Sequence, residues 1–162
     1  MIVVTNAGPL IALAQIGQFE LLRLLYGQVH IPPGVCDEVN AVGPDCPGAA
    51  EMVAANWINI VRVNDPTAVE LLRDRLDKGE SEAIVLAIEL QADLLLIDEA
   101  RGRRVAEARG LNKTGTIGTL ILAKKFGLIL AVTPVLDRLL SKGFRMSEDL
   151  YQIARSLADE SN

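Results

Sequence analysis

Short aliphatic runs of strand length alternate with helical patterns along this chain, and two of those runs end at a polar side chain. Residues 2–5 lead into Asn6, and residues 94–97 lead into Asp98-Glu99. The alternation is typical of βαβ units and favours a mainly parallel central sheet. Because ligands collect at the carboxyl ends of the strands in such sheets, the sequence predicts an α/β fold with a polar site at one edge.

The expected elements follow from apolar periodicity and from the positions of glycine and proline. Strands are predicted at residues 2–5, 29–31, 58–63, 94–97 and near 113–114. Helices are predicted from Pro9, over 18–26, from Pro32-Pro33 through Glu38, over 49–55 and 67–76, from Glu80 or Ser81 to Leu90, and over 101–109, 117–126, 134–142 and 147–157. The 58–63 run alternates apolar and polar residues, as an edge strand does, whereas 94–97 is expected to be the central strand. Lys78-Gly79 is expected to break a helix.

Length and composition limit the class of protein. A chain of 162 residues without an internal repeat or linker is expected to form a single domain over 1–162, which buries roughly 70% of its unfolded surface. Apolar residues make up 50% but aromatic residues only 4%, so the core should be aliphatic. No apolar run approaches the ~20 residues of a membrane span, and no basic segment precedes the first strand as it would in a signal peptide. Cys36 and Cys46 form no CxxC pair, which favours a reducing cytoplasm over a disulfide framework.

The net charge of −5 argues against a protein that coats nucleic acid by bulk charge. It does not exclude contact with nucleic acid at one part of the surface, because seven of the 16 basic residues fall between positions 101 and 125. One interpretation is that these residues only solvate helix faces. The other is that Arg101, Arg103 and Arg104, which closely follow Asp98-Glu99, contact phosphates.

Asp98 occupies the clearest candidate position for a functional carboxylate. An unpaired carboxylate inside the core would cost several kcal/mol, so Asp98 should lie at the exit of its strand. There it could equally serve as the N-cap of the next helix, since Asp is among the best caps. Glu99 points away if the strand continues, which makes it the weaker candidate for a ligand.

Four further side chains offer oxygen atoms to the same region. Glu80 and Glu82 open a nearly all-apolar helix, where negative charge is favourable by about 0.3–1 kcal/mol for structural reasons alone. Of the two, Glu82 is better placed, on the first full turn. Glu38 flanks the apolar face of its helix and could equally be solvated, and Asn6 could be a strand-ending turn residue. If the topology brings them to Asp98, they form the set of oxygen ligands that a hard divalent cation needs.

Several segments resemble the PIN domain family. They are IVVTNAGPLIALAQIG, the helix start GESEAIVLA, and LLLIDEARGRRVAEARGL followed by TGTIGTLILAKKFGLI. More narrowly, they resemble the PIN-like branch related to VapC-type toxin ribonucleases, over essentially the whole chain. The resemblance implies a three-layer α/β/α sandwich with a mainly parallel central sheet. It also implies a Mg²⁺- or Mn²⁺-dependent nuclease site made of four acidic positions.

The resemblance assigns a role to each candidate residue. The acidic residue after the first strand falls on Asn6, where PIN nucleases usually have Asp, and the third position falls on Glu82 with Glu80 as a rival. The implied metal ligands are Asn6, Glu38, Glu82 and Asp98, and the implied catalytic residues are Glu38, Glu82 and Asp98. Additional candidates are Thr5, Glu80, Glu99 and Thr116, the last matching a small hydroxyl residue near the metal. Arg101, Arg103 and Arg104 would contact the phosphates of RNA.

The expected function is a metal-dependent endoribonuclease of PIN type that acts on RNA in the cytoplasm. The resemblance also implies the toxin of a toxin–antitoxin pair, with an antitoxin protein as partner and a homodimer formed through the apolar helices at about 134–157. The alternative is a PIN-like fold that binds RNA or protein without cleaving it, and the uncharged Asn6 favours this alternative. A receiver-like signalling domain is a third alternative, but it requires paired acidic residues after the first strand, which the sequence TNAG lacks.

Overall fold

A parallel sheet orders the fold. In the computed structural model, which describes residues 1–161, five strands join in the order β3-β2-β1-β4-β5, and every neighbouring pair runs parallel. The strands are β1 (Val3–Thr5), β2 (Val29–Ile31), β3 (Ile58–Ile60), β4 (Leu94–Leu96) and β5 (Lys113–Thr114). The middle strand β1 pairs with β4 in the register Val4↔Leu95 and Thr5↔Leu96.

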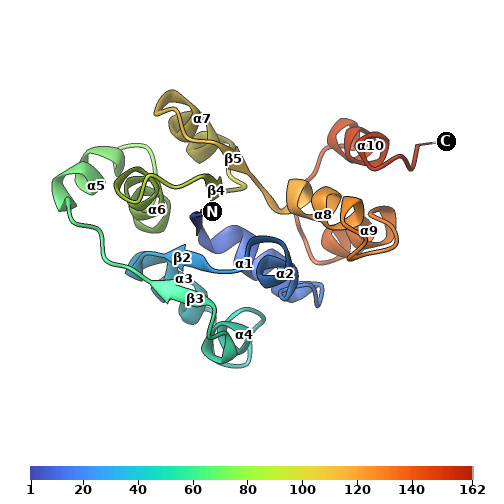
Figure 1. Cartoon of the computed structure of the whole chain (residues 1–162), viewed down its shortest axis with the longest axis horizontal. Helices are drawn as coiled ribbons and strands as arrows, with labels where there is room; N and C mark the ends of the chain where they lie inside the picture. Colours follow the sequence, from blue (N-terminus) through green and yellow to red (C-terminus); the bar gives the residue numbers. More distant parts are fainter. Residues whose placement is uncertain (162) are drawn as a thin grey trace.

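Helices cover both faces of this sheet. Between β1 and β3 the chain forms α1 (Ala7–Gln15), α2 (Leu21–Tyr26), α3 (Pro33–Ala41) and α4 (Ala49–Ala54). Between β3 and β5 it forms α5 (Pro66–Leu72), α6 (Lys78–Glu89) and α7 (Ala100–Ala108). After β5 come α8 (Thr116–Lys125), α9 (Thr133–Ser141) and α10 (Glu148–Leu157). Figure 1 shows α5 and α6 on one side of the sheet and α1 and α2 on the other, which is the predicted three-layer α/β/α arrangement.

The core is aliphatic, as the composition predicts. Strands β1 and β4 supply fully buried side chains such as Val3, Val4 and Leu96. Helix α6 is buried on nearly all sides from Gly79 to Ala87, because it packs against β1, β4, α3 and α5. A helix in that position must be apolar all round, which explains why its acidic residues lie only near its two ends. Even so, within residues 1–161 no helix is long and apolar enough to cross a bilayer.

The structure shifts some of the predicted elements. We expected residues 94–97 to form the central strand. In the structure β1 is the central strand, and β4 lies next to it with only β5 beyond. The helix expected over 67–76 is shorter, and Lys78-Gly79 do not break a helix but form the first turn of α6. Asp77 explains this difference, because its carboxylate accepts the Glu80 N–H at 2.8 Å and caps α6 earlier than expected. Strand β3 lies at one edge of the sheet, as its alternating pattern predicts.

Two other elements are shorter than predicted. The strand expected over 58–63 ends at Ile60 because the neighbouring strand β2 ends at Ile31, whose carbonyl accepts the Val61 N–H at 2.9 Å. The helix expected over 18–26 begins only at Leu21, because Gln18 still belongs to the turn that ends α1 at Gly17 (φ +70°) and donates its N–H to the Leu13 carbonyl at 2.8 Å. Both differences come from interactions that the apolar periodicity does not reveal.

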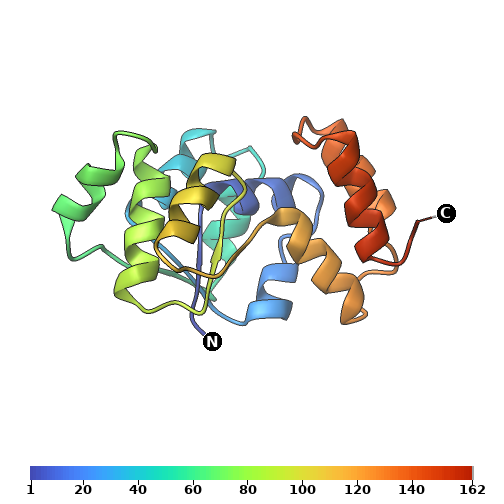
Figure 2. The same cartoon turned by 90° about the horizontal axis from the view of Figure 1, so that it is seen from above.

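The C-terminal helices form a separate flank. Figure 2 shows α9 and α10 beside α8, at the end of the molecule opposite α5. The Glu160 carboxylate ties this flank together, because it accepts the N–H groups of Val132 (2.7 Å) and Thr133 (2.9 Å) at the start of α9. It also lies 2.9 Å from Nζ of Lys124 in α8. Partial burial raises the pKa of Glu160, but these hydrogen bonds outweigh burial and lower the pKa to about 2.

We predict that Glu160→Gln lowers the free energy of unfolding by about 1–2 kcal/mol, because the amide loses the negative charge that Lys124 and the start of α9 favour. A folded-state pKa of about 2 lies below the ordinary value of 4.5. The stabilisation is therefore complete above pH 4.5 and is lost as the pH falls toward 2. Urea unfolding at about pH 7 and about pH 3 measures it, with Asp159→Asn as an exposed control. An equal loss in the control, or a loss that persists undiminished at the lower pH, would contradict this role.

Candidate active site

Strands β1 and β4 end side by side at one edge of the sheet. The Thr5↔Leu96 pairing is continued by a hydrogen bond from the Asn6 N–H to the Leu96 carbonyl at 2.9 Å. Asn6 and Asp98 therefore lie at the same edge, where parallel sheets place their ligands. A Cβ built on Gly8 would lie 3.4 Å from Oδ2 of Asp98, so the start of α1 closely approaches this carboxylate.

The Asp98 carboxylate is held by the first residue of α8. Its Oδ1 accepts the Thr116 N–H and its Oδ2 accepts the Thr116 hydroxyl, both at 2.7 Å. A Cβ on Gly115 would fall 2.5 Å from Oδ1, so a residue with a side chain does not fit there. The helix that follows Asp98 has Glu99 at its N-cap and receives no side-chain capping bond. The Asp98 carboxylate therefore binds the N-terminus of α8. It does not cap α7, the helix that follows Asp98 in the chain.

Electrostatics at Asp98 favour an added cation. Burial raises the pKa of Asp98, and the Thr116 hydrogen bonds and the Arg103 guanidinium offset this rise only in part. The neighbouring charge of Glu99 raises the pKa further. Arg103 donates from Nη1 to the Ile97 carbonyl at 3.1 Å, directly before Asp98. The surroundings therefore leave some of the negative charge at this edge uncompensated.

Asn6 contributes a buried oxygen without a hydrogen bond. The residue is only 4% exposed, yet its Oδ1 has no partner among residues 1–161. Asn6 is the N-cap of α1, but its side chain makes no capping bond, so a turn or cap role does not explain the carboxamide. A buried polar atom without a partner costs about 1–3 kcal/mol and is exceptional in native proteins. A bound cation would give this oxygen a partner.

Glu82 and Glu38 reach across the junction of α3 and α6 in opposite directions. The buried Glu82 accepts the Gly34 N–H at 3.0 Å through Oε1, in the first turn of α3. Glu38 places its Oε1 2.8 Å from where a Cβ on Gly79 would lie, in the first turn of α6. Partial burial and the charge of Asp77 raise the pKa of Glu38. Both side chains therefore lie where these two helices begin.

Glu80 faces a different helix from Glu82. Its Oε2 lies 3.1 Å from where a Cβ on Gly102 of α7 would be. Burial raises the pKa of Glu80 to about 8, and Asp77 contributes through a hydrogen bond and its charge. Glu99 and Glu38 add further like charge. Glu80 is therefore protonated at neutral pH, a form that binds cations poorly.

The oxygen atoms of Asn6, Glu38, Glu82 and Asp98 do not surround a single point in the structure. Within residues 1–161, no three acidic, histidine or cysteine side chains gather closely enough to hold a metal ion. The carboxylates of Asp98 and Glu82 are instead directed to the N-termini of α8 and α3. The donor chemistry, including the unpartnered Asn6 oxygen, fits a hard cation such as Mg²⁺ or Mn²⁺.

A cleft of about 850 Å³ opens beside Asp98. Its walls come from α1, α7, α8 and the C-terminal flank, and its charged lining residues are Asp98, Glu99, Arg103, Lys142 and Arg145. Lys142 and Arg145 carry no local sequence signal of a site, because only the packing of the C-terminal flank brings them to this cleft. The candidate Thr5 lies beneath the edge, where its fully buried hydroxyl donates to the Asn6 carbonyl at 3.0 Å.

The arginines that follow Asp98 do not share one surface. Arg103 lines the cleft, whereas Arg101 and Arg104 line a second hollow. Positions 101 and 104 are one helical turn apart and share a face of α7, but position 103 does not share it. The three side chains therefore cannot clamp the same phosphate.

A profile of the PIN domain family matches residues 2–160. The match spans β1, α3, α6, β4 and α8, and so includes each residue of the candidate site. No curated protein matches the chain significantly.

We predict that Glu80→Gln raises the free energy of unfolding, and increasingly so as the pH rises. The pKa of Glu80 is about 8 in the folded protein and near 4.5 in the unfolded chain, so folding loses stability between pH 4.5 and 8. The amide resembles the protonated carboxyl and removes this loss. Chemical unfolding in EDTA at about pH 5 and about pH 8 measures the effect, with Asp45→Asn as an exposed control. A gain that is the same at both pH values would show that charge is not its cause.

Proposed function

This chain belongs to the PIN domain family, whose fold is of nuclease type, and we propose that it is a metal-dependent endoribonuclease that hydrolyses phosphodiester bonds of RNA. The observation that carries the proposal is the buried, unpartnered oxygen of Asn6 at the sheet edge that also ends in Asp98. This oxygen accepts no hydrogen bond within residues 1–161, and a cation would give it a partner.

The chain's own residues suit this task. Asn6, Glu38, Glu82 and Asp98 would hold a Mg²⁺ or Mn²⁺ ion. When bound, the ion supplies Lewis acidity and neutralises charge during phosphodiester hydrolysis. Thr116 restrains the Asp98 carboxylate through two hydrogen bonds, so this ligand is already ordered before a cation binds.

Positive side chains in the cleft support an RNA substrate. Arg103, Lys142 and Arg145 line the same cleft as Asp98, although the chain as a whole has a net charge of −5. Local positive charge of this kind attracts phosphates and orients them through hydrogen bonds. The cleft offers Phe144 as an aromatic lining residue, which favours recognition of the backbone over extensive base stacking.

A PIN-like fold that binds RNA or protein without cleaving it is the second candidate function. Two observations favour it. Asn6 brings no negative charge to the site, and no three acidic side chains within residues 1–161 form a ligand set. The two candidates differ in a single measurable property, which is cleavage of single-stranded RNA that depends on a divalent cation.

The toxin role is part of the first proposal and requires a partner surface. Leu136 and Leu139 are fully buried in the chain's own core, so the apolar surface of the C-terminal flank is narrower than the sequence suggests. Its exposed apolar residues are Leu140 on α9, at 40%, and Leu150, Ile153 and Leu157 on α10, at 40%, 54% and 66%. Leu150 and Leu157 also line the Asp98 cleft. We propose that the exposed apolar residues of α9 and α10 outside the cleft provide the contact in a homodimer and that an antitoxin protein restrains the enzyme.

We predict that Asp98→Asn reduces RNA cleavage roughly a hundredfold or more, because the change removes the charge that binds the cation at the sheet edge. Glu99→Gln should be much milder, since Glu99 is exposed and does not contact Thr116. Cleavage of a labelled single-stranded RNA in Mn²⁺ and in EDTA, with circular dichroism of each variant, measures the effect. Equal residual activity in the two variants would overturn the role of Asp98, and activity that survives EDTA would overturn the metal requirement.

We predict two opposite effects for Asn6→Asp. The added carboxylate should tighten Mn²⁺ binding and raise activity, because hard cations favour charged oxygen ligands. Without a cation, the same charge increases repulsion at Asp98 and should lower the melting temperature. Calorimetric titration of Mn²⁺ and thermal melts in EDTA measure both, with Asn59→Asp on the edge strand β3 as a control. If neither affinity nor apo stability changes, the Asn6 side chain does not face the carboxylates.

A further inference from the structure

Helix α7 separates the active-site cleft from a second groove. Arg103 lines the cleft, whereas Arg101 and Arg104 line a groove of about 680 Å³ between α7 and the end of α5. Position 103 lies roughly 200° around the helix from position 101. Both hollows therefore flank the one helix that begins directly after Asp98-Glu99.

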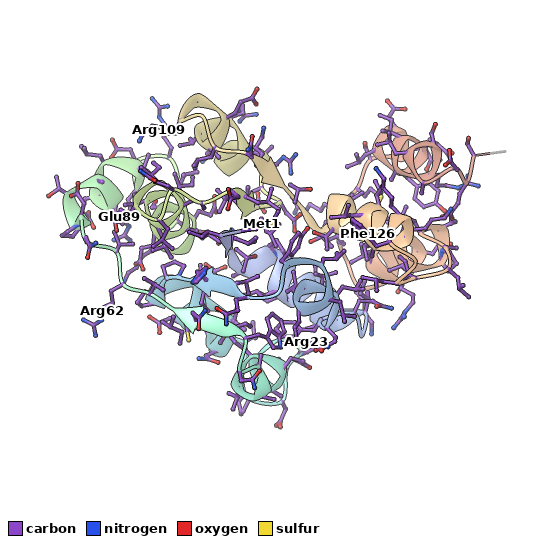
Figure 3. All side chains as sticks on the ribbon, viewed as in Figure 1. Met1, Arg23, Arg62, Glu89, Arg109 and Phe126 are labelled. Atoms are coloured by element: carbon purple, nitrogen blue, oxygen red, sulfur yellow. The ribbon has the colours of Figure 1, made fainter. Side chains whose placement is uncertain are left out.

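Arginine dominates the lining of this groove. Its charged residues are Arg75, Arg101, Arg104, Arg109 and Asp74. Four guanidinium groups thus face one carboxylate, in a chain whose net charge is −5. Figure 3 shows Arg109 extending outward from α7. Such a concentration of one sign of charge in a concave surface attracts ligands of the opposite sign.

The described part of the chain does not neutralise these arginines. The ion pairs within residues 1–161 involve Arg23, Arg73, Lys113 and Lys124, and none of the groove arginines. Arg101 donates to the Arg75 carbonyl at 3.2 Å, a bond that orders its side chain and leaves its charge unchanged. A bound anion would reduce the repulsion between these positive charges. Because four arginines line the groove, an anion with several charges is favoured.

We propose that this groove, defined by Arg75, Arg101, Arg104 and Arg109, binds the phosphate backbone of the RNA strand that enters the Asp98 cleft. The inference rests on the proposed function and extends it, because it assigns a long single strand as the substrate. From Arg101 to Arg109 the helix rises about 12 Å, which accommodates about three successive phosphates of one strand. Guanidinium groups bind phosphate oxygens through paired hydrogen bonds. No described aromatic residue lines the groove, so binding should not depend on base sequence.

A repeating chain of charges fits this groove better than an acidic protein segment does. Protein interfaces take most of their affinity from a few apolar or aromatic anchors that fill pockets. Of the two leucines that line the groove, Leu72 is only 5% exposed and belongs to the chain's own core, whereas Leu71 is 72% exposed. One exposed leucine stands beside four arginines, so charge dominates the groove and favours a ligand that carries a negative charge on every unit.

The test compares Arg104→Ala/Arg109→Ala with Arg62→Ala. All three side chains are exposed, and Figure 3 shows Arg109 and Arg62 at separate edges of the molecule, Arg109 at the top and Arg62 at the lower left. Binding of fluorescein-labelled poly(U) RNA is measured by anisotropy in EDTA over a range of salt concentrations. We expect the double variant to bind about tenfold more weakly, with a salt slope reduced by about 1.4, and Arg62→Ala to bind like the wild type. In Mn²⁺, the KM for long RNA should rise while kcat is retained.

The other outcomes separate this inference from the proposed function. If the wild type binds and cleaves poly(U) but the double variant behaves like Arg62→Ala, the groove is not an RNA site and the nuclease proposal stands. If RNA binds and the double variant weakens it but no cleavage occurs in Mn²⁺, the groove stands and the nuclease proposal falls. If the protein binds poly-glutamate through these arginines and does not bind poly(U), the occupant is an acidic protein and the RNA inference is overturned.

Discussion

The pairing of β1 with β4 is the constraint on which the candidate site depends. The hydrogen bond from the Asn6 N–H to the Leu96 carbonyl extends their register to the edge of the sheet. A slip of one residue would turn the side chains of one strand to the opposite face. Asn6 and Asp98, at the ends of these two strands, would then be out of register with each other, whereas the bond between Asp98 and Thr116 depends on the separate pairing of β4 with β5.

Helix N-termini provide the donors that buried carboxylates need. Asp98 binds the start of α8, Glu82 that of α3, and Glu160 that of α9. The surrounding charge distinguishes a structural site from a candidate active site. Lys124 neutralises Glu160, whose pKa is low, whereas neighbouring acids contribute to the raised pKa values of Asp98 and Glu80. Uncompensated carboxylates of this kind are typical of functional sites.

Local patterns in the sequence were sufficient for the parallel sheet and for the meeting of Asn6 and Asp98, because both follow from apolar runs that end at a polar residue. They were not sufficient for the partners of Glu82 or for the cleft residue Arg145. Those depend on how α3 packs against α6 and how the C-terminal flank packs against α8. The cap at Asp77 did carry a local signal, an acidic residue three positions before Glu80 at the start of a helix.

The most direct test of the central claim is paramagnetic broadening of the protein's NMR signals by Mn²⁺ at substoichiometric concentration. A cation at the sheet edge should broaden the side-chain amide signals of Asn6 and the backbone N–H signals of Gly8 and Thr116, and Mg²⁺ should compete it away. The Asn59 side chain, at the far edge strand β3, provides the unaffected reference. If the Asn6 and Thr116 signals persist while Mn²⁺ broadens other parts of the surface, this edge of the sheet is not a metal site.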